Sequence, residues 1–403
     1  MTRATAPAKP RSTFSKLGLL GTLYFAQGLP YGFFQVVVPV ELRQRGWDLD
    51  KIGLSALLLS PWAFKFAWAP VLDRVWWKRL GRRRTWILSM QVASMIVLAT
   101  AAVSGGGSIP LLFGATFAVN LLAATQDIAT DGLGVELLDD DERGPANGLQ
   151  VGAYRFGMVI GGGVLLLFAK QLHQSGMFAV MAALTLLATL PVALAEEPPL
   201  PPKPASVAAN AHFLRRPGVW PIIALLLVYK AGETFASAVQ KPFLVDHHLD
   251  LEAIGLLTGT VGSTAGIAGA ILGGVLVTKI GRRRSLVLFG LGQAIAVAGY
   301  IYLALAPPSM TALYAVCTVE TFASGAATAA LFTCMMDWSE RFSSGTDYTT
   351  QASTVVWAQL AFGVLGGFSA KAFGYATHFA VASALCVVAV LGAYALFPSE
   401  RRS

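Results

Sequence analysis

Long apolar segments follow one another along almost the whole chain, separated by short polar loops. A helix needs about 20 mostly apolar residues to cross the hydrocarbon core of a bilayer. Twelve segments meet this requirement: 17–40, 52–72, 85–104, 110–138, 145–170, 174–195, 219–241, 252–277, 285–306, 309–336, 347–372 and 375–397. Several contain glycine or proline, which membrane helices tolerate. The pattern predicts an all-α integral membrane protein with twelve transmembrane helices.

The composition supports this membrane interpretation. Of the 403 residues, 55% are hydrophobic and 13% are charged, and the mean hydropathy is +0.60. A soluble domain carries about 25% charged residues, so lipid must be part of the solvent of this chain. The net charge of +8 resides in short loops between apolar segments, which argues against a nucleic-acid partner. The three cysteines form no CxxC pair or Cys/His cluster, so no disulfide, metal site or cofactor is predicted.

The distribution of lysine and arginine predicts the orientation in the membrane. Basic residues are frequent at the N-terminus, in the loops at 73–84 and 279–284, and in the C-terminal tail, whereas the loops after helices 3 and 9 contain none. The loop after the first helix is a mild exception. Cytoplasmic loops carry the excess of positive charge. We therefore expect both termini in the cytoplasm, and we interpret the first apolar segment as a retained span because it is too long for a signal-peptide core.

The chain divides into two similar halves. A proline-rich polar stretch at 196–218 interrupts the apolar pattern and reads as a cytoplasmic linker. The sequence Gly-Arg-Arg-Arg at 81–84 recurs at 281–284, and a Gly-Gly pair occurs in helices 5 and 11. The predicted divisions are a tail at 1–16, a six-helix bundle at 17–195, the linker at 196–218, a second six-helix bundle at 219–397 and a tail at 398–403. Two pseudo-symmetric bundles in parallel repeats resemble the major facilitator fold.

Charged residues lie inside several predicted spans, where each costs at least about 2.5–3.5 kcal/mol. In the first half, Asp127 and Asp131 are four residues apart and share one face of helix 4. Lys65 and Arg155 lie at a similar depth in helices 2 and 5. These four residues predict one buried cluster whose charges cancel without substrate. Two interpretations remain open: a fixed ion-pair network, or an acid that titrates beside a base that binds an anionic substrate.

The second half has a smaller set of buried charges. Lys230 and Glu233 are three residues apart on helix 7, and Glu320 is about as deep in helix 10. Helices 1, 4, 7 and 10 surround the central cavity in the major facilitator layout. Either glutamate can neutralise Lys230, and burial and the lysine have opposed effects on the proton affinity of a carboxylate. This set predicts proton coupling, with a silent ion pair as the alternative.

Two further groups complete the candidate residues. Polar and aromatic residues beside the charges predict a substrate pocket, with plain helix packing as the alternative: Tyr24, Gln27, Tyr31 and Gln126. Cytoplasmic loop and helix-end residues predict a conformational gate, with simple positive-inside topology as the alternative: Asp73, Arg74, Gly81, Arg82, Gly281, Arg282 and Asp337.

Four segments, in order along the chain, resemble the muropeptide permease (AmpG) and acetyl-CoA transporter group of the major facilitator superfamily. They are FKFAWAP at 64–70 with Asp73 and Arg74, QDI at 126–128 with Asp131, ERG at 142–144 with YRFG at 154–157, and YKAGE at 229–233 with PFL at 242–244. QGLPYGFF at 27–34 and GTDYTTQ at 345–351 look most like the rhizobactin/pyochelin-type siderophore permeases. The group usually has an aspartate where Glu233 stands.

The resemblance implies a function that the charges suit independently. We expect a monomeric secondary transporter of the bacterial inner membrane that imports a bulky anionic solute with protons by alternating access. A siderophore or ferri-siderophore is favoured, and a muropeptide or acetyl-CoA is the alternative. An enzyme such as a membrane-embedded acyltransferase would need a nucleophile and a base near the membrane surface. No histidine lies within the predicted charge clusters, so catalysis is not predicted.

Overall fold

The computed structural model describes residues 12–46, 55–105, 108–195, 197, 213–247, 249, 251–305 and 309–398. The predicted N-terminal tail up to residue 11, most of the predicted linker and the last five residues lie outside this described part. The described elements are all helical.

The first half of the chain forms helices that follow the predicted spans. Its elements are α1 (Thr13–Gly32), η1 (Phe33–Val37), α2 (Val38–Gln44), η2 (Ser55–Leu59), α4 (Ser60–Phe64), η3 (Lys65–Ala67), α5 (Ala69–Arg74), α6 (Arg82–Val103), α7 (Ile109–Leu137), α8 (Arg143–Met158), η4 (Val159–Val164), α9 (Leu165–Leu167) and α10 (Ala169–Leu194). The continuous run from α1 to α2 forms the first span, and the run from η2 to α5 forms the second.

The second half repeats this arrangement. Its elements are η5 (Phe213–Arg215), α11 (Val219–Tyr229), α12 (Ala231–Asp246), α13 (Leu251–Ile254), η6 (Gly255–Val261), α14 (Gly262–Ile280), α15 (Arg282–Leu305), α16 (Met310–Asp337), η7 (Arg341–Ser343) and α17 (Ser344–Leu396). Within α17, Gly374 has φ 76° and ψ 169°, so the chain turns there and the helix makes two passes. Nine helices of the described part are long and apolar enough to span a membrane. With the second pass of α17 and the first two spans, they give the predicted twelve.

Two spans are less regular than the apolar pattern predicts. The second span was expected as one helix, but it has 3-10 turns at η2 and η3 between short α-helices. Pro61 and Pro70 lie near the starts of α4 and α5, where proline is tolerated, and proline disrupts the hydrogen bonds of the preceding turn. The seventh span is interrupted between α11 and α12, where Lys230 has φ −100° and ψ 3°. Lys65 and Lys230 therefore both lie at irregular points of their spans, a feature that transporters use to build binding sites.

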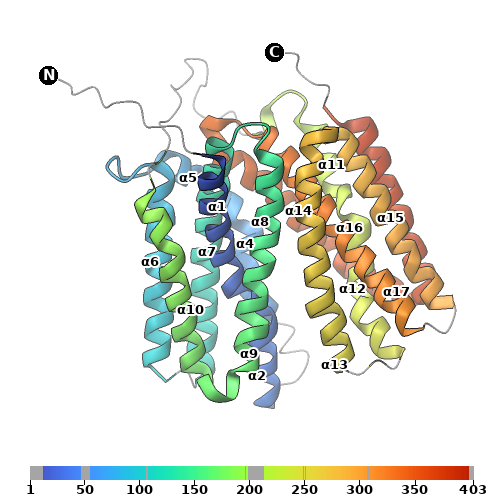
Figure 1. The fold of residues 1–403 in the computed structure, drawn as a ribbon, viewed down its shortest axis with the longest axis horizontal. Coiled ribbons are helices and arrows are strands. Elements are labelled where there is room, and N and C mark those ends of the chain that lie inside the picture. The colour runs from blue at the N-terminus through green and yellow to red at the C-terminus, as the bar shows by residue number, and fades with distance from the viewer. Residues whose placement is uncertain are drawn as a thin grey trace.

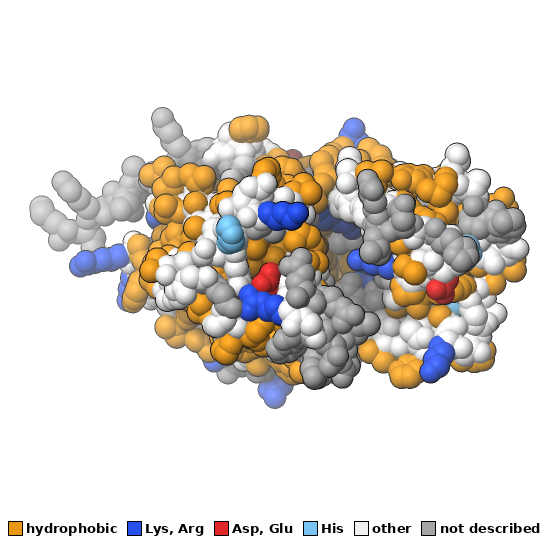
Figure 2. Space-filling model, turned by 90° about the horizontal axis from the view of Figure 1, so that it is seen from below, with side chains coloured by type: hydrophobic (Ala, Val, Ile, Leu, Met, Phe, Trp, Pro, Cys, Tyr) orange, Lys and Arg blue, Asp and Glu red, His pale blue; other side chains and the backbone are white. Residues whose placement is uncertain are grey.

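The helices form two groups that meet on one side of the membrane. Figure 1 shows the elements through α10 in one group and those from α11 in the other, with both ends of the chain on the same face, which we call the terminal side. On this side α8 packs on α14, where an added Cβ at Gly148 would lie 2.7 Å from the Ala270 carbonyl oxygen. On the opposite side a hollow separates the two groups (Figure 2). The structure is closed on the terminal side and open on the other.

Candidate transport site and gate

The buried charges of the first half contact one another. Lys65 forms an ion pair with Asp127, and its Nζ lies 4.0 Å from Oδ2 of Asp131. The Tyr24 hydroxyl donates a hydrogen bond of 2.8 Å to the other oxygen of Asp131. All four side chains are buried and come from α1, η3 and α7. The predicted association of Lys65 with the two aspartates is confirmed, and it lies wholly within the first half.

Arg155 does not belong to this group, so the predicted four-charge cluster is wrong in this member. The Arg155 guanidinium lies against Gly266 of α14, where an added Cβ would overlap it. The acids that act on it electrostatically are Glu233 and Glu320, both in the second half. Helix α8 packs on α14, and the missing side chain of Gly266 leaves the space through which Arg155 crosses between the halves.

The charges of the second half are only partly paired with one another. Lys230 forms an ion pair with Glu233 and donates a hydrogen bond of 3.1 Å to Thr328. Glu233 also accepts a hydrogen bond from Ser324. Glu320 has only a long contact of 3.4 Å with the Thr321 hydroxyl. Of the two glutamates predicted to neutralise Lys230, Glu233 forms the ion pair, whereas Glu320 is within electrostatic reach of Lys230 without a salt bridge to it among the described residues.

Arg155 and Glu320 therefore form a distinct pair. Within the described ranges, neither side chain has a salt bridge, and Arg155 has no hydrogen bond. Arg155 is densely surrounded by protein and is still partly accessible, as expected for the wall of an open cavity. A guanidinium with unused donors suits a carboxylate or phosphate, and a buried carboxylate without a base suits a proton.

The predicted pocket residues fall into two environments. Gln27 donates a hydrogen bond of 3.1 Å to Thr130 and, with Gln126, lines an internal cavity of about 20 Å³ inside the first bundle. The buried Gln27 Oε1 and Gln126 Nε2 have no partner among the described residues. A polar cavity of this size holds one water molecule. Tyr24 is buried beside Asp131, whereas Tyr31 is partly accessible.

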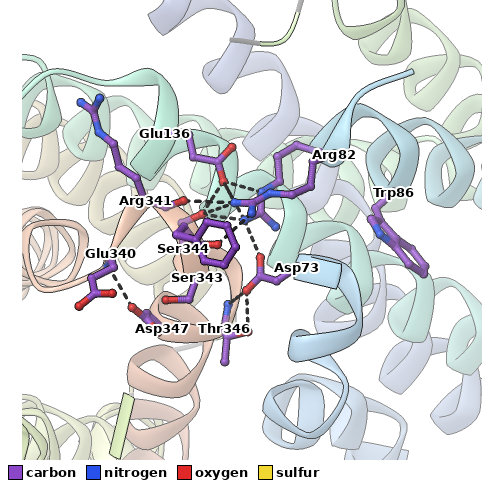
Figure 3. A network of polar contacts seen from close by, with 12 residues as sticks. Asp73, Arg82, Trp86, Glu136, Glu340, Arg341, Ser343, Ser344, Thr346 and Asp347 are labelled. Carbon is purple, nitrogen blue, oxygen red and sulfur yellow. Dashed lines mark hydrogen bonds and ion pairs between the residues drawn. The ribbon is translucent and has the colours of Figure 1, made fainter. Parts of the chain in front are cut away.

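Loop residues of the first half close the terminal side on the start of α17 (Figure 3). Arg83 pairs with Asp73 at 2.6 Å and with Glu136 at 2.8 Å, and Arg82 also pairs with Glu136. Asp73 accepts hydrogen bonds of 2.8 Å and 2.6 Å from the backbone N–H and the hydroxyl of Thr346. Burial raises the pKa of Asp73, but Arg83 and the bonds from Thr346 outweigh it and hold that pKa below its usual value.

The repeated loop of the second half makes the reciprocal contact. Arg282 pairs with Asp337 at 2.8 Å and donates to the Asp140 carbonyl after α7. Asp337 also pairs with Arg143 at 2.7 Å. In the first half, Arg82 likewise pairs with Glu136, at the end of α7 in the same bundle. It also donates a hydrogen bond of 2.9 Å to the Phe342 carbonyl, which follows α16 of the other bundle. Each arginine thus ties its own bundle to the loop after the corresponding helix of the other bundle.

The remaining predicted gate residues have more modest contacts. Gly81 and Gly281 have φ values of 97° and 88°, which favour glycine at the turns before α6 and α15. A side chain at Gly81 would overlap Glu197, whose carboxylate accepts 2.8 Å and 3.1 Å bonds from the N–H groups of Arg83 and Arg84. Arg74 is exposed.

Several gate residues were missed by the sequence interpretation: Arg83, Glu136, Arg143, Arg216, Ser344, Thr346 and Asp347. Arg216, at the end of the predicted linker, pairs at 2.6 Å with Asp347. The signal for Asp347 was present, since an acid beside a predicted helix start needs a basic partner. Sequence alone does not show which base that is.

Comparisons with known proteins agree with this architecture. A model of the Major Facilitator Superfamily matches residues 20–346 and, in a second match, 234–403. The chain resembles the fucose transporter FucP in its outward conformation, with a TM-score of 0.72 at 14% identity over 96% of this chain and 100% of that one. It also resembles the human organic anion transporter MFSD10, with a TM-score of 0.73 at 12% identity over 95% and 100% of the two chains. These likenesses concern the fold.

Curated relatives narrow the family. The anhydromuropeptide permease of Escherichia coli K12 is 30% identical over 388 residues, which cover 94% of this chain and 78% of the relative. The putative transporter AmpG 4 of Rickettsia felis is 24% identical over 349 residues, or 82% and 84% of the two chains. An uncharacterized protein of Haemophilus influenzae is 31% identical over 379 residues, or 88% of each chain.

The named relatives are transporters and permeases rather than enzymes, and they support the muropeptide alternative over the siderophore interpretation that the sequence favoured. The family match, the twelve spans and the two bundles agree on a multi-pass membrane protein. The chain is a member of the Major Facilitator Superfamily and a homologue of its AmpG-type permeases.

Proposed function

We propose that the protein imports a muropeptide-type solute, a sugar that carries an acidic peptide, together with protons. The observation that carries the proposal is the pair formed by Arg155 and Glu320 at the boundary between the halves. Neither side chain has a salt bridge among the described residues, and Arg155 lies against Gly266, close to Thr321, the residue that follows Glu320 in α16. The relationship to the anhydromuropeptide permease supports this class of substrate.

The coupling follows from the charge balance of the site. Without substrate, Lys230 and Arg155 balance Glu233 and Glu320. A carboxylate of the substrate that binds Arg155 adds a negative charge beside both glutamates. Uptake of a proton by Glu320 restores neutrality, which lowers the cost of moving the loaded site through the membrane. Substrate and proton then favour the same conformational change because each binds more tightly when the other is present.

Alternating access uses the gate on the terminal side. Opening toward that side requires the salt bridges of Arg82, Arg83 and Arg282 to separate, while the hollow on the opposite side closes. The positive-inside pattern supports a cytoplasmic location for the terminal side, and the relationship to a bacterial permease supports the inner membrane. The substrate enters from the outside in the conformation seen here. A single chain contains both bundles and the site, so a monomer is sufficient.

Uptake into proteoliposomes tests the proposal. Radiolabelled anhydromuropeptide, ferri-siderophore and acetyl-CoA are each offered with and without an inward proton gradient. We expect gradient-driven accumulation of the muropeptide alone. Accumulation of the ferri-siderophore or acetyl-CoA in its place would refute the substrate assignment, and equal uptake without the gradient would refute proton coupling.

Two variants assign the roles within the site. Glu320→Gln should abolish gradient-driven uptake and retain exchange of internal for external substrate, because a permanently neutral side chain still permits the loaded site to move. Arg155→Gln should reduce both activities at least about 100-fold, which corresponds to about 2.7 kcal/mol. Loss of exchange in Glu320→Gln would place Glu320 in substrate binding rather than in coupling.

A further inference from the structure

Three aromatic side chains from different helices of the first bundle meet one another. The ring centroids of Tyr31 and Trp62 are 6.4 Å apart in an edge-to-face arrangement, and those of Tyr31 and Tyr154 are 5.7 Å apart. Trp62 belongs to α4, Tyr31 to α1, and Tyr154 to α8, where it immediately precedes Arg155. We call Tyr31, Trp62 and Tyr154 the aromatic wall.

The wall is held in a fixed position. Trp62 Nε1 donates a hydrogen bond of 3.1 Å to Asn120, and Gln35 donates one of 3.1 Å to the Tyr31 hydroxyl. The Lys65 ammonium lies 5.5 Å from the centroid of the Trp62 ring. These contacts fix the rings from the side of the first bundle. The Tyr154 hydroxyl has no hydrogen bond within the described part of the chain and remains available.

The rings of the wall are accessible although they lie deep in the protein. Tyr31, Trp62 and Tyr154 are each half-buried, and both tyrosines are densely surrounded by protein atoms. The second half offers a contrast in its own aromatic cluster. There Phe243, Tyr300 and Phe379 pack edge to face and stacked, and each is at most 1% exposed. The second cluster consists of fully buried rings, whereas the rings of the first leave accessible surface on which a ligand can pack.

We propose that the aromatic wall binds a pyranose ring of the substrate while Arg155 binds its acidic group, an assignment that rests on the function proposed above. The apolar C–H face of a sugar packs on an aromatic ring, and its hydroxyls suit the phenol groups and the Gln35 amide at the edge. Tyr154 and Arg155 are consecutive in α8, so their side chains diverge around the helix axis, and the substrate presents its sugar to one and its acid to the other. The wall belongs to the first half and the acid-binding pair spans both halves.

Binding of separated fragments tests this division. The probes are the peptide-free disaccharide of anhydromuropeptide, the free acidic peptide and an aryl catecholate. Quenching of intrinsic tryptophan fluorescence should report binding of the disaccharide to the wild-type protein. Trp62→Ala should weaken that binding at least about 10-fold and leave binding of the peptide unchanged, whereas Trp62→Phe, which retains a ring, should keep most of it. This binding test does not depend on whether uptake is coupled to protons.

Trp77→Ala provides the matched control, because Trp77 is 65% exposed in the loop on the terminal side. It should bind all three probes like the wild type. Tyr154→Ala, read by isothermal calorimetry, should repeat the selective loss of the disaccharide without removing a tryptophan. The proposal is overturned if the wall variants weaken the disaccharide and the peptide equally, if the disaccharide does not bind the wild type, or if the catecholate binds the wall better than the disaccharide does. Failure of the proposed function would appear instead as missing uptake despite disaccharide binding.

Discussion

The two buried charge clusters of this protein differ in which bundle supplies the partners of their charges. In the first half, Lys65 meets Asp127 and Asp131, and Tyr24 completes the group within the same bundle. In the second half, Lys230 pairs with Glu233, and Glu320 lies within electrostatic reach of Lys230 and of Arg155 from the other bundle. The first cluster keeps its contacts when the bundles move as rigid bodies. The second changes its surroundings whenever they move.

This difference separates structural charges from functional ones. Contacts made inside one bundle are kept when the bundles move as rigid bodies, so we expect them to stabilise the bundle in every conformation. A charge balanced across the boundary makes the conformational equilibrium depend on protonation and on bound anions. Proton-responsive roles were predicted for Asp127 and Asp131 as well as for Glu233 and Glu320. The geometry favours Glu320 among them, and the following predictions test that division.

The largest effect is expected from breaking the first cluster. Lys65→Met leaves two buried carboxylates without their base and should lower the free energy of unfolding by about 3–5 kcal/mol. The double variant Lys65→Met/Asp127→Asn should recover part of this loss, because it removes one of the two carboxylates left without a base. Arg155→Gln should change stability by less than about 1 kcal/mol, since Arg155 is partly accessible. Thermal unfolding in detergent measures all three, and equal destabilisation by Lys65→Met and Arg155→Gln would contradict the distinction.

An intermediate effect on stability is expected at the gate, where Arg83 and the corresponding Arg283 of the second repeat differ in their contacts. Arg83 is fully buried between Asp73, Glu136 and Ser344, whereas Arg283 donates to the Tyr394 carbonyl at the surface. Arg83→Gln should cost about 2–3 kcal/mol through lost charged hydrogen bonds, and Arg283→Gln should stay within about 0.5 kcal/mol.

The same pair of variants has a conformational readout. Distances between spin labels at the exposed positions Arg79 and Arg341 should lengthen in Arg83→Gln as the terminal side opens. The Arg283→Gln variant should keep the wild-type distance distribution. Opening in both variants would show that the two loops carry the gate equally, against the asymmetry seen in their contacts.

The smallest effect is expected where the first bundle is tied at its surface. Lys16 pairs with Glu142 at 2.6 Å, and Thr13 donates 2.6 Å to the same carboxylate. Burial raises the pKa of Glu142, but the bonds from Lys16 and Thr13 lower it, and the result lies below the usual value. The carboxylate therefore adds stability above its usual pKa, which is lost as pH falls through the lowered pKa.

The magnitude of this pH effect should stay below about 1 kcal/mol, as for other surface pairs. Thermal unfolding of the wild type between pH 7 and pH 3.5 should show it, and Lys16→Gln should reduce the dependence. An identical pH profile in Lys16→Gln and the wild type would show that Lys16 does not hold the Glu142 carboxylate in its ionised form.

The chain pattern alone determined the membrane class, the twelve spans, the pairing of the two halves and the depth of the buried charges. These properties follow from local quantities, namely the length of apolar runs and the rise of a helix per residue. The pattern also placed Lys65 with its aspartates, because residues four apart on one helix share a face that a neighbouring base can reach. It named Arg82, Arg282 and Asp337 as gate residues but did not identify their partners.

Only the tertiary structure decided whether each buried charge interacts with residues of its own half or of the other half. Depth along a helix is fixed by sequence position, but the direction of Arg155 depends on how α8 packs on α14 and on the space left by Gly266. The two Gly-Arg-Arg-Arg repeats have the same sequence. The Arg83 side chain nevertheless points into the protein, because it pairs there with Asp73 and Glu136. Asp73 lies ten residues before Arg83, and the residue ten before Arg283 is Gly273. Arg283 therefore lacks the corresponding acid, and its side chain lies at the surface. The direction of a charged side chain is set by its ion-pair and hydrogen-bond partners. Those partners belong to distant parts of the chain that only the packing of helices brings together.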